Sequence, residues 1–344
     1  MDKRGNGRMK VLVTGAGGYI GSMLARELLG AGHQVVALDR FFFGREPLDG
    51  AGPVEVVQKD IRDVDASDFA GIDAVCDLAA LSNDPSGEID PGLTQAINHG
   101  GRRRVSAAAR RAGVRRYVLS SSCSVYGAAD RPLLAEDAPT APLTTYARST
   151  LDAEHDAFAL AGDGFCVTAL RNATVFGLSP RMRFDLVINL MTLHAVERGL
   201  VTVMGGGRQW RPLVHVQDVA RAFRMAIEAP VEVVDRQVFN IGLCNMQVRS
   251  LAFVVRETLP IPVQVSIAPD DADRRNYSIA FDKAATRLGF TARVPVEDGV
   301  REIYDALKYG RVESGPRTST VGWYRSILDA KRLVSAVELD GRVL

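Results

Sequence analysis

Short apolar runs alternate with longer segments of helical periodicity over the first 170 residues. The apolar runs are largely β-branched and uninterrupted, which predicts strands covered on both faces, because a half-exposed strand alternates polar and apolar positions. The predicted strands lie at residues 10–13, 34–38, 54–58, 72–78, 115–120 and 165–170, and the predicted helices at 18–31, 93–112 and 146–161. Strands that alternate with helices in this way predict an α/β fold with a doubly wound parallel sheet and right-handed crossovers.

The pattern changes after about residue 170. Loops lengthen, proline and glycine cluster, and short strands mix with helices. We therefore expect a flexible N-terminus at residues 1–8 and a dinucleotide-binding domain at 9–170. Residues 171–344 are expected to form mainly a smaller α/β substrate lobe, from which the chain returns to the first sheet around residues 214–241.

The turn from the first strand into the first helix contains glycines at positions 15, 18 and 21. Gly15 permits the tight turn, Gly18 lets the backbone approach a pyrophosphate, and Gly21 lets helix and strand pack closely. The pyrophosphate would then meet the positive end of the helix. Asp39, at the end of the second strand, is placed to bind a ribose hydroxyl and would repel a 2′-phosphate, a preference that Arg40 weakens slightly. This order of features predicts a Rossmann-like unit that binds NAD.

Composition and charge narrow the class of protein further. The 344 residues carry 42 Lys+Arg against 41 Asp+Glu, and this balance argues against a nucleic-acid binder, which needs a basic excess. Neither a signal peptide nor a transmembrane helix is expected, because no apolar stretch of the required length follows the N-terminus or occurs elsewhere. The four cysteines and five histidines show no metal-ligand spacing, so we expect reduced thiols, a cytoplasmic location and no bound metal.

Further motifs follow the glycine loop in a fixed order: Asp60-Ile61-Arg62-Asp63, Asp77-Leu78-Ala79-Ala80, Asn98, Ser120-Ser121-Ser122-Cys123-Ser124-Val125-Tyr126-Gly127, Tyr146-Ala147-Arg148-Ser149 and Arg211-Pro212-Leu213-Val214-His215. From about residue 9 to 310 the chain resembles the extended short-chain dehydrogenase/reductases, in their NAD-dependent sugar-nucleotide epimerase/dehydratase branch, which includes UDP-galactose 4-epimerase-like enzymes. The resemblance implies NAD as cofactor and a nucleoside-diphosphate sugar as substrate. It also implies a homodimer paired through the helices at 93–112 and 146–161.

The resemblance assigns roles to individual residues. Ser122 and Tyr146 match the catalytic Ser/Thr and tyrosine of the family. The implied cofactor-binding residues are Gly15, Gly18, Tyr19, Ile20, Gly21, Asp39, Arg40, Asp60, Ile61, Leu78, Ala79, Ala80, Asn98 and Tyr146. The implied substrate-binding residues are Ser82, Asn83, Ser122, Ser124, Thr174, Asn189, Arg211 and Arg275. The two arginines suit a diphosphate because a guanidinium binds phosphate oxygens bidentately, whereas Asn83 fits a turn without ligand contact equally well.

One departure from the family pattern bears directly on the chemistry. The family's tyrosine belongs to a YxxxK motif, but Thr150 stands where the lysine is expected, one turn after Tyr146. Without that cation the pKa of the tyrosine would rise by about 2–3 units, which costs roughly a hundred- to a thousandfold in rate. Three explanations stay open: an engineered change, another cation nearby, or a task that needs no strong phenolate. Arg148 is the nearest cation in sequence but points to another side of the helix.

A second departure concerns the residues after Ser122. Sugar-nucleotide 4,6-dehydratases of the family carry an Asp-Glu pair where Cys123 and Ser124 stand here, which disfavours dehydration. Cys123 is either an unusual acid or base or a small buried residue beneath the nicotinamide. His215 is expected to be structural. Most of the arginines at 102–104, 110–111 and 115–116 are expected on solvated helix faces or paired with local acids, with a polyanion site as the alternative.

These observations predict an NAD-dependent epimerase that acts through a transient keto sugar. Tyr146 would remove a hydroxyl proton, and Ser122 would bind the developing carbonyl oxygen. The alternatives are a sugar-nucleotide reductase or dehydratase/lyase of the same family, or a catalytically impaired protein that binds NAD or a sugar nucleotide.

Overall fold

A seven-stranded sheet forms the centre of the protein, and every pair of neighbouring strands in it is parallel. The computed structural model describes residues 7–127, 133–269 and 276–343. The strands lie in the order β10-β6-β5-β4-β1-β2-β3, with bounds β1 Lys10–Thr14, β2 Gln34–Asp39, β3 Val54–Gln58, β4 Ala74–Asp77, β5 Arg116–Ser122, β6 Cys166–Asn172 and β10 Gln237–Ile241. This order confirms the predicted doubly wound, Rossmann-like sheet.

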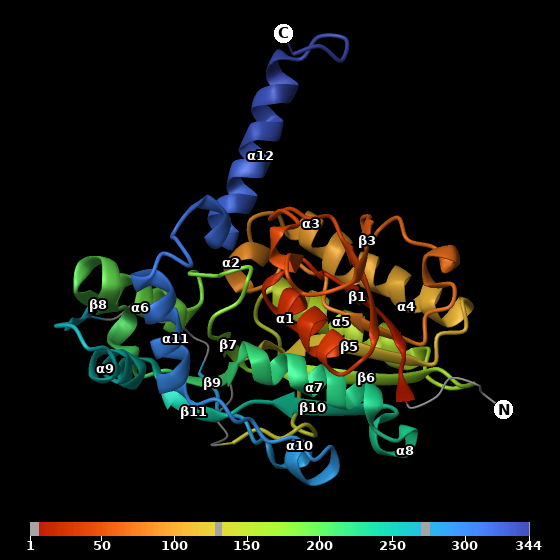
Figure 1. Cartoon of the computed structure of the whole chain (residues 1–344), viewed down its shortest axis with the longest axis horizontal. Helices are drawn as coiled ribbons and strands as arrows, with labels where there is room; N and C mark the ends of the chain where they lie inside the picture. The colour runs from red at the N-terminus through yellow and green to blue at the C-terminus, as the bar shows by residue number, and fades with distance from the viewer. Residues whose placement is uncertain (1–6, 128–132, 270–275, 344) are drawn as a thin grey trace.

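Helices cover both faces of this sheet, which explains the uninterrupted apolar strands (Figure 1). Helices α1 (Tyr19–Gly30) and α7 (Val216–Glu228) pack together on one face, and α4 (Arg102–Arg111) and α5 (Thr145–Ala159) pack on the other. An apolar cluster fills each face. β3 lies at the edge of the sheet, and there Val56 is 41% exposed.

The predicted helix at 93–112 is not a single α-helix. It consists of α3 (Pro91–Thr94), the π-helix η4 (Gln95–Gly101) and α4. A π-helix admits an extra residue per turn, which the apolar periodicity of an α-helix does not reveal. Asn98 lies inside the π-helix, where its amide accepts a hydrogen bond from the Leu81 N–H and donates one to the Leu81 carbonyl (2.8 and 3.1 Å).

Two smaller sheets follow, in the second part of the chain. One has the order β11-β9-β7 (β7 Thr174–Phe176, β9 Trp210–His215, β11 Cys244–Gln247), and the other pairs β8 Leu200–Val203 with β12 Gln264–Ile267. Helices α6 (Val187–Arg198), α9 (Val248–Thr258) and α11 (Val296–Lys308) enclose an apolar cluster with them. The chain rejoins the large sheet through α7 and β10, whereas β9 stays in the three-stranded sheet.

The remaining elements are short, apart from the last helix. The short α-helices are α2 Asp84–Gly87, α8 Val231–Val234 and α10 Asp282–Arg287, and the 3₁₀ turns are η2 Glu46–Leu48, η3 Ala66–Phe69, η5 Cys123–Tyr126, η6 Gly205–Gly207 and η7 Pro316–Thr318. Helix α12 (Thr320–Val337) projects away from the body (Figure 1). Its first turn packs on the loop after β2, because Trp323 Nε1 donates to the Phe42 carbonyl (2.6 Å), but Leu333 is 67% exposed.

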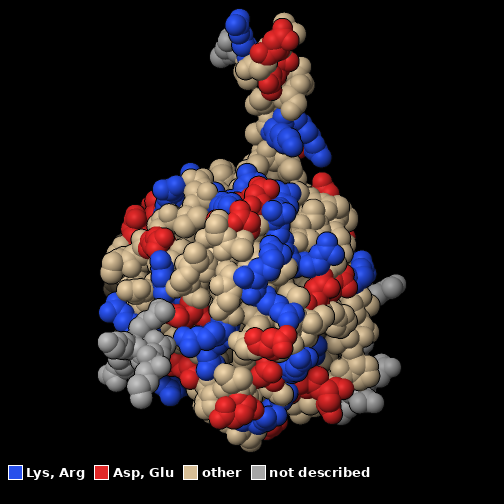
Figure 2. Space-filling view, turned by 90° about the vertical axis from the view of Figure 1, so that its right-hand side faces the viewer, with Lys and Arg blue, Asp and Glu red and all other residues tan. Residues whose placement is uncertain are grey.

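The surface carries charges of both signs. Figure 2 shows lysine and arginine side chains lying among aspartate and glutamate side chains on the face in view, as the balanced composition predicts. Among the described residues, no helix combines the length and the apolar character needed to cross a membrane.

Candidate functional site

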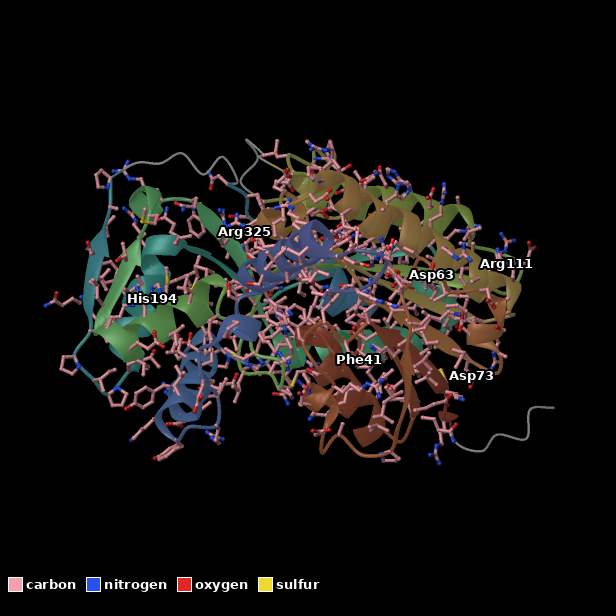
Figure 3. All side chains as sticks on the ribbon, turned by 90° about the horizontal axis from the view of Figure 1, so that it is seen from above. Phe41, Asp63, Asp73, Arg111, His194 and Arg325 are labelled. Atoms are coloured by element: carbon pink, nitrogen blue, oxygen red, sulfur yellow. The ribbon has the colours of Figure 1, made fainter. Side chains whose placement is uncertain are left out.

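A cavity of about 420 Å³ lies at the carboxyl ends of the parallel strands, where open α/β sheets bind ligands. Its wall takes residues from the loops that follow β1 to β6 and from the second part of the chain, including Arg183 and Arg211. The beginning of α12 completes the wall with Thr320 and Tyr324. Figure 3 shows α12, marked by Arg325, over the boundary between the two parts of the molecule.

The glycine loop fits a dinucleotide at one end of this cavity. Gly15 has a φ of +68°, and a Cβ there would lie 2.9 Å from the backbone nitrogen of Ala79. A Cβ on Gly21 would lie only 2.1 Å from the Gly15 carbonyl oxygen, so the loop and helix α1 pack backbone to backbone. Gly18 is the N-cap of α1 and has no side chain to occupy the first N–H groups. Those groups therefore remain available to a diphosphate.

Asp39 and Arg40, at the end of β2, bear on the choice between NAD and NADP. The Asp39 carboxylate accepts hydrogen bonds from the N–H groups of Gly17 (3.0 Å) and Phe41 (2.6 Å), and burial raises its pKa while these hydrogen bonds oppose the rise. Arg40 donates to Asp60 (3.0 Å). Since Asp60 holds the Arg40 guanidinium and the acid at 39 would repel a 2′-phosphate, this end of the cavity favours NAD over NADP.

Ser122 and Tyr146 lie in the wall of the same cavity. Ser122 ends β5, which is three strands away from β2 in the sheet, or roughly 14 Å. The Ser122 hydroxyl oxygen accepts hydrogen bonds from the N–H (3.1 Å) and the hydroxyl (2.9 Å) of Ser124. Both contacts use the Ser122 oxygen as acceptor, and the Ser122 side chain also hydrogen-bonds to Tyr146, so the two groups form one pair in the cavity wall.

Tyr146 is positioned by the start of α5. Thr144 caps this helix by accepting from the Ala147 N–H (3.1 Å), and its hydroxyl donates to Asp84 (2.6 Å). A Cβ on Gly87 would lie 2.9 Å from the Tyr146 Cβ, so the short helix α2 packs directly against the tyrosine. These contacts hold the tyrosine where α2, α5 and β5 meet.

The surroundings of Tyr146 oppose its ionisation. Burial raises the pKa of the phenol, and the carboxylate of Asp84 raises it further. The positive charge of Arg102, hydrogen bonding by Ser122 and the charge of Arg183 act in the opposite direction but do not outweigh burial. Work as a proton acceptor therefore depends on cations close to this tyrosine.

Most of the residues expected at the site do line the cavity. These are Gly15, Gly18, Tyr19, Ile20, Gly21, Asp39, Arg40, Asp60, Ile61, Leu78, Ala79, Ala80, Ser82, Asn83, Ser122, Ser124, Tyr146, Thr174 and Arg211. Arg275 lies outside the described residues. Asn98 and Asn189 do not line the cavity: Asn98 holds the Leu81 backbone, and Asn189 accepts from the Gly177 N–H (3.0 Å) and donates to the Tyr19 hydroxyl (3.1 Å).

Thr150 and Cys123, two expected catalytic positions, are also absent from the cavity wall. Thr150 is buried, and its hydroxyl has no hydrogen-bond partner in the described structure. The Cys123 thiol donates to the Arg171 carbonyl (3.2 Å), and burial raises its pKa. Of the two alternatives for Cys123, this environment favours the small buried residue over the acid or base.

Several residues of the wall escaped the sequence analysis, among them Arg102, Arg181, Arg183 and Tyr324. Arg183 forms two hydrogen bonds to Asp185 (3.0 Å each) and donates to the Ser82 hydroxyl (2.9 Å). No sequence signal pointed to these four residues: Arg102 belongs to the arginine-rich stretch, and the structure shows it buried, with its Nε donating to Asp77 (3.1 Å).

Histidines contribute no cluster to the site. Among the described residues, no group of three or more His, Cys, Asp or Glu side chains could hold a metal ion. Figure 3 shows His194 on α6, away from the seven-stranded sheet. His215 caps α7 through the Gln217 N–H (3.2 Å) and contacts Glu302 (2.6 Å), a structural arrangement.

Fold and site together define a dinucleotide-dependent enzyme of the short-chain dehydrogenase/reductase type, with a glycine loop, an acid after β2 and a Ser-Tyr pair in one cavity. The chain belongs to the NAD dependent epimerase/dehydratase family, whose model matches residues 11–242. NAD is therefore the cofactor. The wall of the cavity also contains the buried Asn172 Oδ1, an acceptor that has no hydrogen-bond partner in the described structure.

Characterised enzymes of this family are similar to the chain in sequence and in structure. The chain is 28% identical over 304 residues to UDP-glucose 4-epimerase of Corynebacterium glutamicum, covering 82% of this chain and 91% of that protein. It is 27% identical over 311 residues to UDP-glucuronic acid decarboxylase 1 of Xenopus tropicalis, covering 86% and 71%. Among solved structures, MoeE5 in complex with UDP-glucuronic acid and NAD is 32% identical, with a TM-score of 0.77 and coverage of 88% and 99%.

Proposed function

We propose that this protein interconverts epimers of a nucleoside-diphosphate sugar, with a UDP-hexose as the favoured substrate class. One observation carries the proposal: Ser122 and Tyr146 share a cavity with the glycine loop and Asp39. A sugar bound beside the cofactor would therefore meet a proton acceptor and a hydrogen-bond donor together. The names of the relatives, which include UDP-glucose 4-epimerase, support UDP as the nucleotide.

The first half of the proposed reaction oxidises one carbinol carbon. Tyr146, as the phenolate, accepts the hydroxyl proton while the carbon gives up a hydride. Bound NAD supplies the hydride acceptor, held by the glycine loop and Asp39. Ser122 donates a hydrogen bond, and keeps its proton, to the oxygen that becomes the carbonyl, because the two contacts from Ser124 use only acceptor positions on the Ser122 oxygen.

The second half returns the hydride and inverts one centre. Either the keto sugar presents its other face, or the neighbouring carbon loses and regains a proton before reduction. Tyr146 then gives back its proton to the sugar oxygen. Cofactor and enzyme end in their starting states, so the reaction needs no external reductant.

The second part of the chain is proposed to hold the nucleotide. Arg211 lies on β9 in the cavity wall, and a guanidinium there suits the diphosphate. Ser82 and Asn83 are proposed to contact the sugar, because both line the cavity and the segment after β7 holds their loop there: Arg183 donates to Ser82 (2.9 Å), and Asn83 donates to Asp185 (3.3 Å).

A second candidate function rests on Thr150. A buried hydroxyl without a partner, where the family places a lysine, supports a protein that binds NAD and a sugar nucleotide without turning it over.

One experiment separates the two candidate functions. Purified protein should be analysed by mass spectrometry for bound nucleotide and then incubated with a panel of UDP-sugars in deuterated water. Epimer formation without net NADH supports the epimerase. Deuterium at the neighbouring carbon identifies the enolisation route, and binding without turnover of any sugar overturns the epimerase in favour of the second candidate.

We also propose a homodimer in the cytoplasm. The four cysteines are free thiols, which suits a reducing compartment. The dimer would pair the helices α4 and α5 with those of a second copy. Light scattering after gel filtration tests the mass, and a monomer at micromolar concentration would refute the dimer.

A further inference from the structure

Arg181 is a buried arginine in the cavity wall, and it lies in the segment between β7 and α6. It is 5% exposed. Its Nη2 donates to the Thr320 hydroxyl (2.9 Å), and its guanidinium carbon lies 3.6 Å from the centre of the Phe43 ring. Its Nε is buried and has no hydrogen-bond partner in the described part of the chain. Among the described residues, no carboxylate forms an ion pair with this guanidinium.

The acids in the neighbourhood are bound to other groups. Asp185 accepts two hydrogen bonds from Arg183 (3.0 Å each), and Asp39 accepts from backbone N–H groups. Burial and the positive charge of Arg183 lower the pKa of Arg181 to about 10, which still leaves it charged at neutral pH. A buried charge without a partner destabilises a protein, so the position of Arg181 indicates an anionic ligand.

The backbone close to Arg181 is attached to the start of helix α1. Ser179, two residues earlier, donates from its hydroxyl to the Tyr19 carbonyl (2.7 Å), and its oxygen lies 3.2 Å from the Ser22 hydroxyl oxygen. Tyr19 and Ser22 belong to the first turn of α1, directly after the N-cap Gly18. This segment is therefore bound to the helix end that suits a diphosphate.

The loop after β2 fixes the guanidinium itself. Phe43 lies beneath it, and Phe41 of the same loop packs on the glycine loop, because a Cβ on Gly17 would lie 2.9 Å from the Phe41 ring. Thr320, at the start of α12, holds one nitrogen from another side. A planar guanidinium fixed in this way can bind phosphate oxygens with little further ordering of its side chain.

Two diphosphates are expected in this cavity, one from the cofactor and one from the sugar nucleotide. Arg211, which is proposed to meet the sugar nucleotide, lies on β9 in the three-stranded sheet. The contacts of Arg181 and its segment run instead to the loop after β2 and to the starts of α1 and α12. This location favours the diphosphate of the cofactor.

We propose that Arg181 binds the diphosphate of NAD, donating to phosphate oxygens that also accept from the N–H groups at the start of α1. Arg181 is then a cofactor-binding residue contributed by the second part of the chain. Its hydrogen bond to Thr320 connects helix α12 to the cofactor. The inference rests on NAD as the cofactor and holds whether or not a sugar is epimerised.

The first test is calorimetric titration of the full chain, freed of bound nucleotide, with NAD. In Arg181→Met we expect the Kd for NAD to rise at least fivefold, because a charged hydrogen-bonded contact is lost. ADP-ribose, which keeps the diphosphate but lacks nicotinamide, should show the same rise, whereas the Kd for UDP should stay within twofold. Arg181→Lys keeps the charge without the planar group and should raise the Kd less than Arg181→Met does.

The matched control for charge is Arg148→Met. Arg148 is exposed and does not line the cavity, so its replacement removes the same charge from the surface of the protein. The Kd for NAD of this control should stay within twofold of that of the unchanged protein.

Thermal unfolding separates ligand binding from a structural role. Without ligand, Arg181→Met should melt at the same temperature as the unchanged protein or higher, because it removes a buried charge that has no acidic partner. Arg183→Met should melt lower, since it leaves Asp185 without its partner. Saturating NAD should raise the melting temperature of Arg181→Met by less than that of the unchanged protein.

Three results would overturn the inference. The first is a rise of less than fivefold in the Kd for NAD of Arg181→Met. The second is a loss of UDP affinity in this variant as large as the loss of NAD affinity, which would assign Arg181 to the sugar nucleotide. The third is an unliganded variant that melts lower than the unchanged protein or does not fold, because Arg181 would then stabilise the fold. None of these measurements uses a sugar, so the inference and the proposed epimerase can fail separately.

Discussion

The contact between helix α1 and the glycine loop can be tested by adding one methyl group. In Gly21→Ala the new Cβ would lie 2.1 Å from the Gly15 carbonyl oxygen and 2.8 Å from the Ala16 Cα. Ordinary contact begins at 3.4 Å, so loop and helix must separate by roughly 1.3 Å. Both neighbouring atoms belong to the backbone, and therefore no side chain can rotate away to make room.

The expected magnitude follows from two opposing effects. Overpacking costs about 1–3 kcal/mol, and a backbone neighbour places this substitution at the upper end. Alanine favours a helix over glycine by about 1 kcal/mol, which leaves a net loss of about 2 kcal/mol in the free energy of unfolding. Since the displaced groups face the diphosphate, we expect the Kd for NAD to rise about tenfold, or about 1.4 kcal/mol.

Chemical denaturation measures the loss of stability, and calorimetric titration measures the Kd for NAD. Gly30→Ala is the matched control, because Gly30 ends the same helix and a Cβ there meets no atom within 4 Å. The control should be neutral or up to about 1 kcal/mol more stable, with unchanged NAD affinity. If Gly21→Ala matches the control in both measurements, the close backbone approach between α1 and the glycine loop does not explain the glycine at position 21.

Three further perturbations test other parts of the site. Tyr146→Phe should lower epimer formation at least about a hundredfold, since it removes the proton acceptor, and leave NAD affinity within about twofold; equal turnover would exclude Tyr146 from the chemistry. Asp60→Asn should lower the free energy of unfolding by about 1 kcal/mol at neutral pH. Burial disfavours the charged form of Asp60, but Arg62 and Arg40 outweigh burial and lower its pKa to about 2. The ordinary pKa of an aspartate side chain is 3.8, so this stabilisation is present above about pH 4 and is lost as the pH falls toward 2; a difference in urea midpoint that persists at the lower pH would contradict it. Deletion of residues 316–344 removes Tyr324 from the cavity wall and should speed NAD release at least about tenfold in stopped-flow traces, whereas deletion of 330–344 should not; equal rates would mean that α12 plays no part in retention.

The strands and the glycine loop could be predicted because their causes are local in sequence. A parallel strand covered on both faces must be apolar along its whole length, and such a run is visible without knowledge of its neighbours. The segment from β1 to Asp39 likewise carries its tight turn, its helix N-terminus and its acid within one short stretch. Gly15, Gly18, Gly21 and Asp39 do lie in one cavity wall, whereas the helix predicted at 93–112 contains a π-helix in its interior.

Other site residues could not be assigned because similar side chains serve packing as well as binding. Asn98 and Asn189 matched binding positions, yet both bind protein groups across long sequence separations. Nothing in the sequence indicated that Thr320 and Tyr324 would reach the cavity, since helix α12 is placed by contacts with Phe42 and Phe43 in the first domain.

The sequence by itself determined the sheet and the cofactor end of the cavity, and it showed a neutral Thr150 where the family motif has a lysine. Only the tertiary structure decided which charges surround Tyr146. Electrostatic effects depend on distance through space and on burial, and these bring Arg102 from another helix to the same cavity while Arg148, two residues from the tyrosine, stays in solvent.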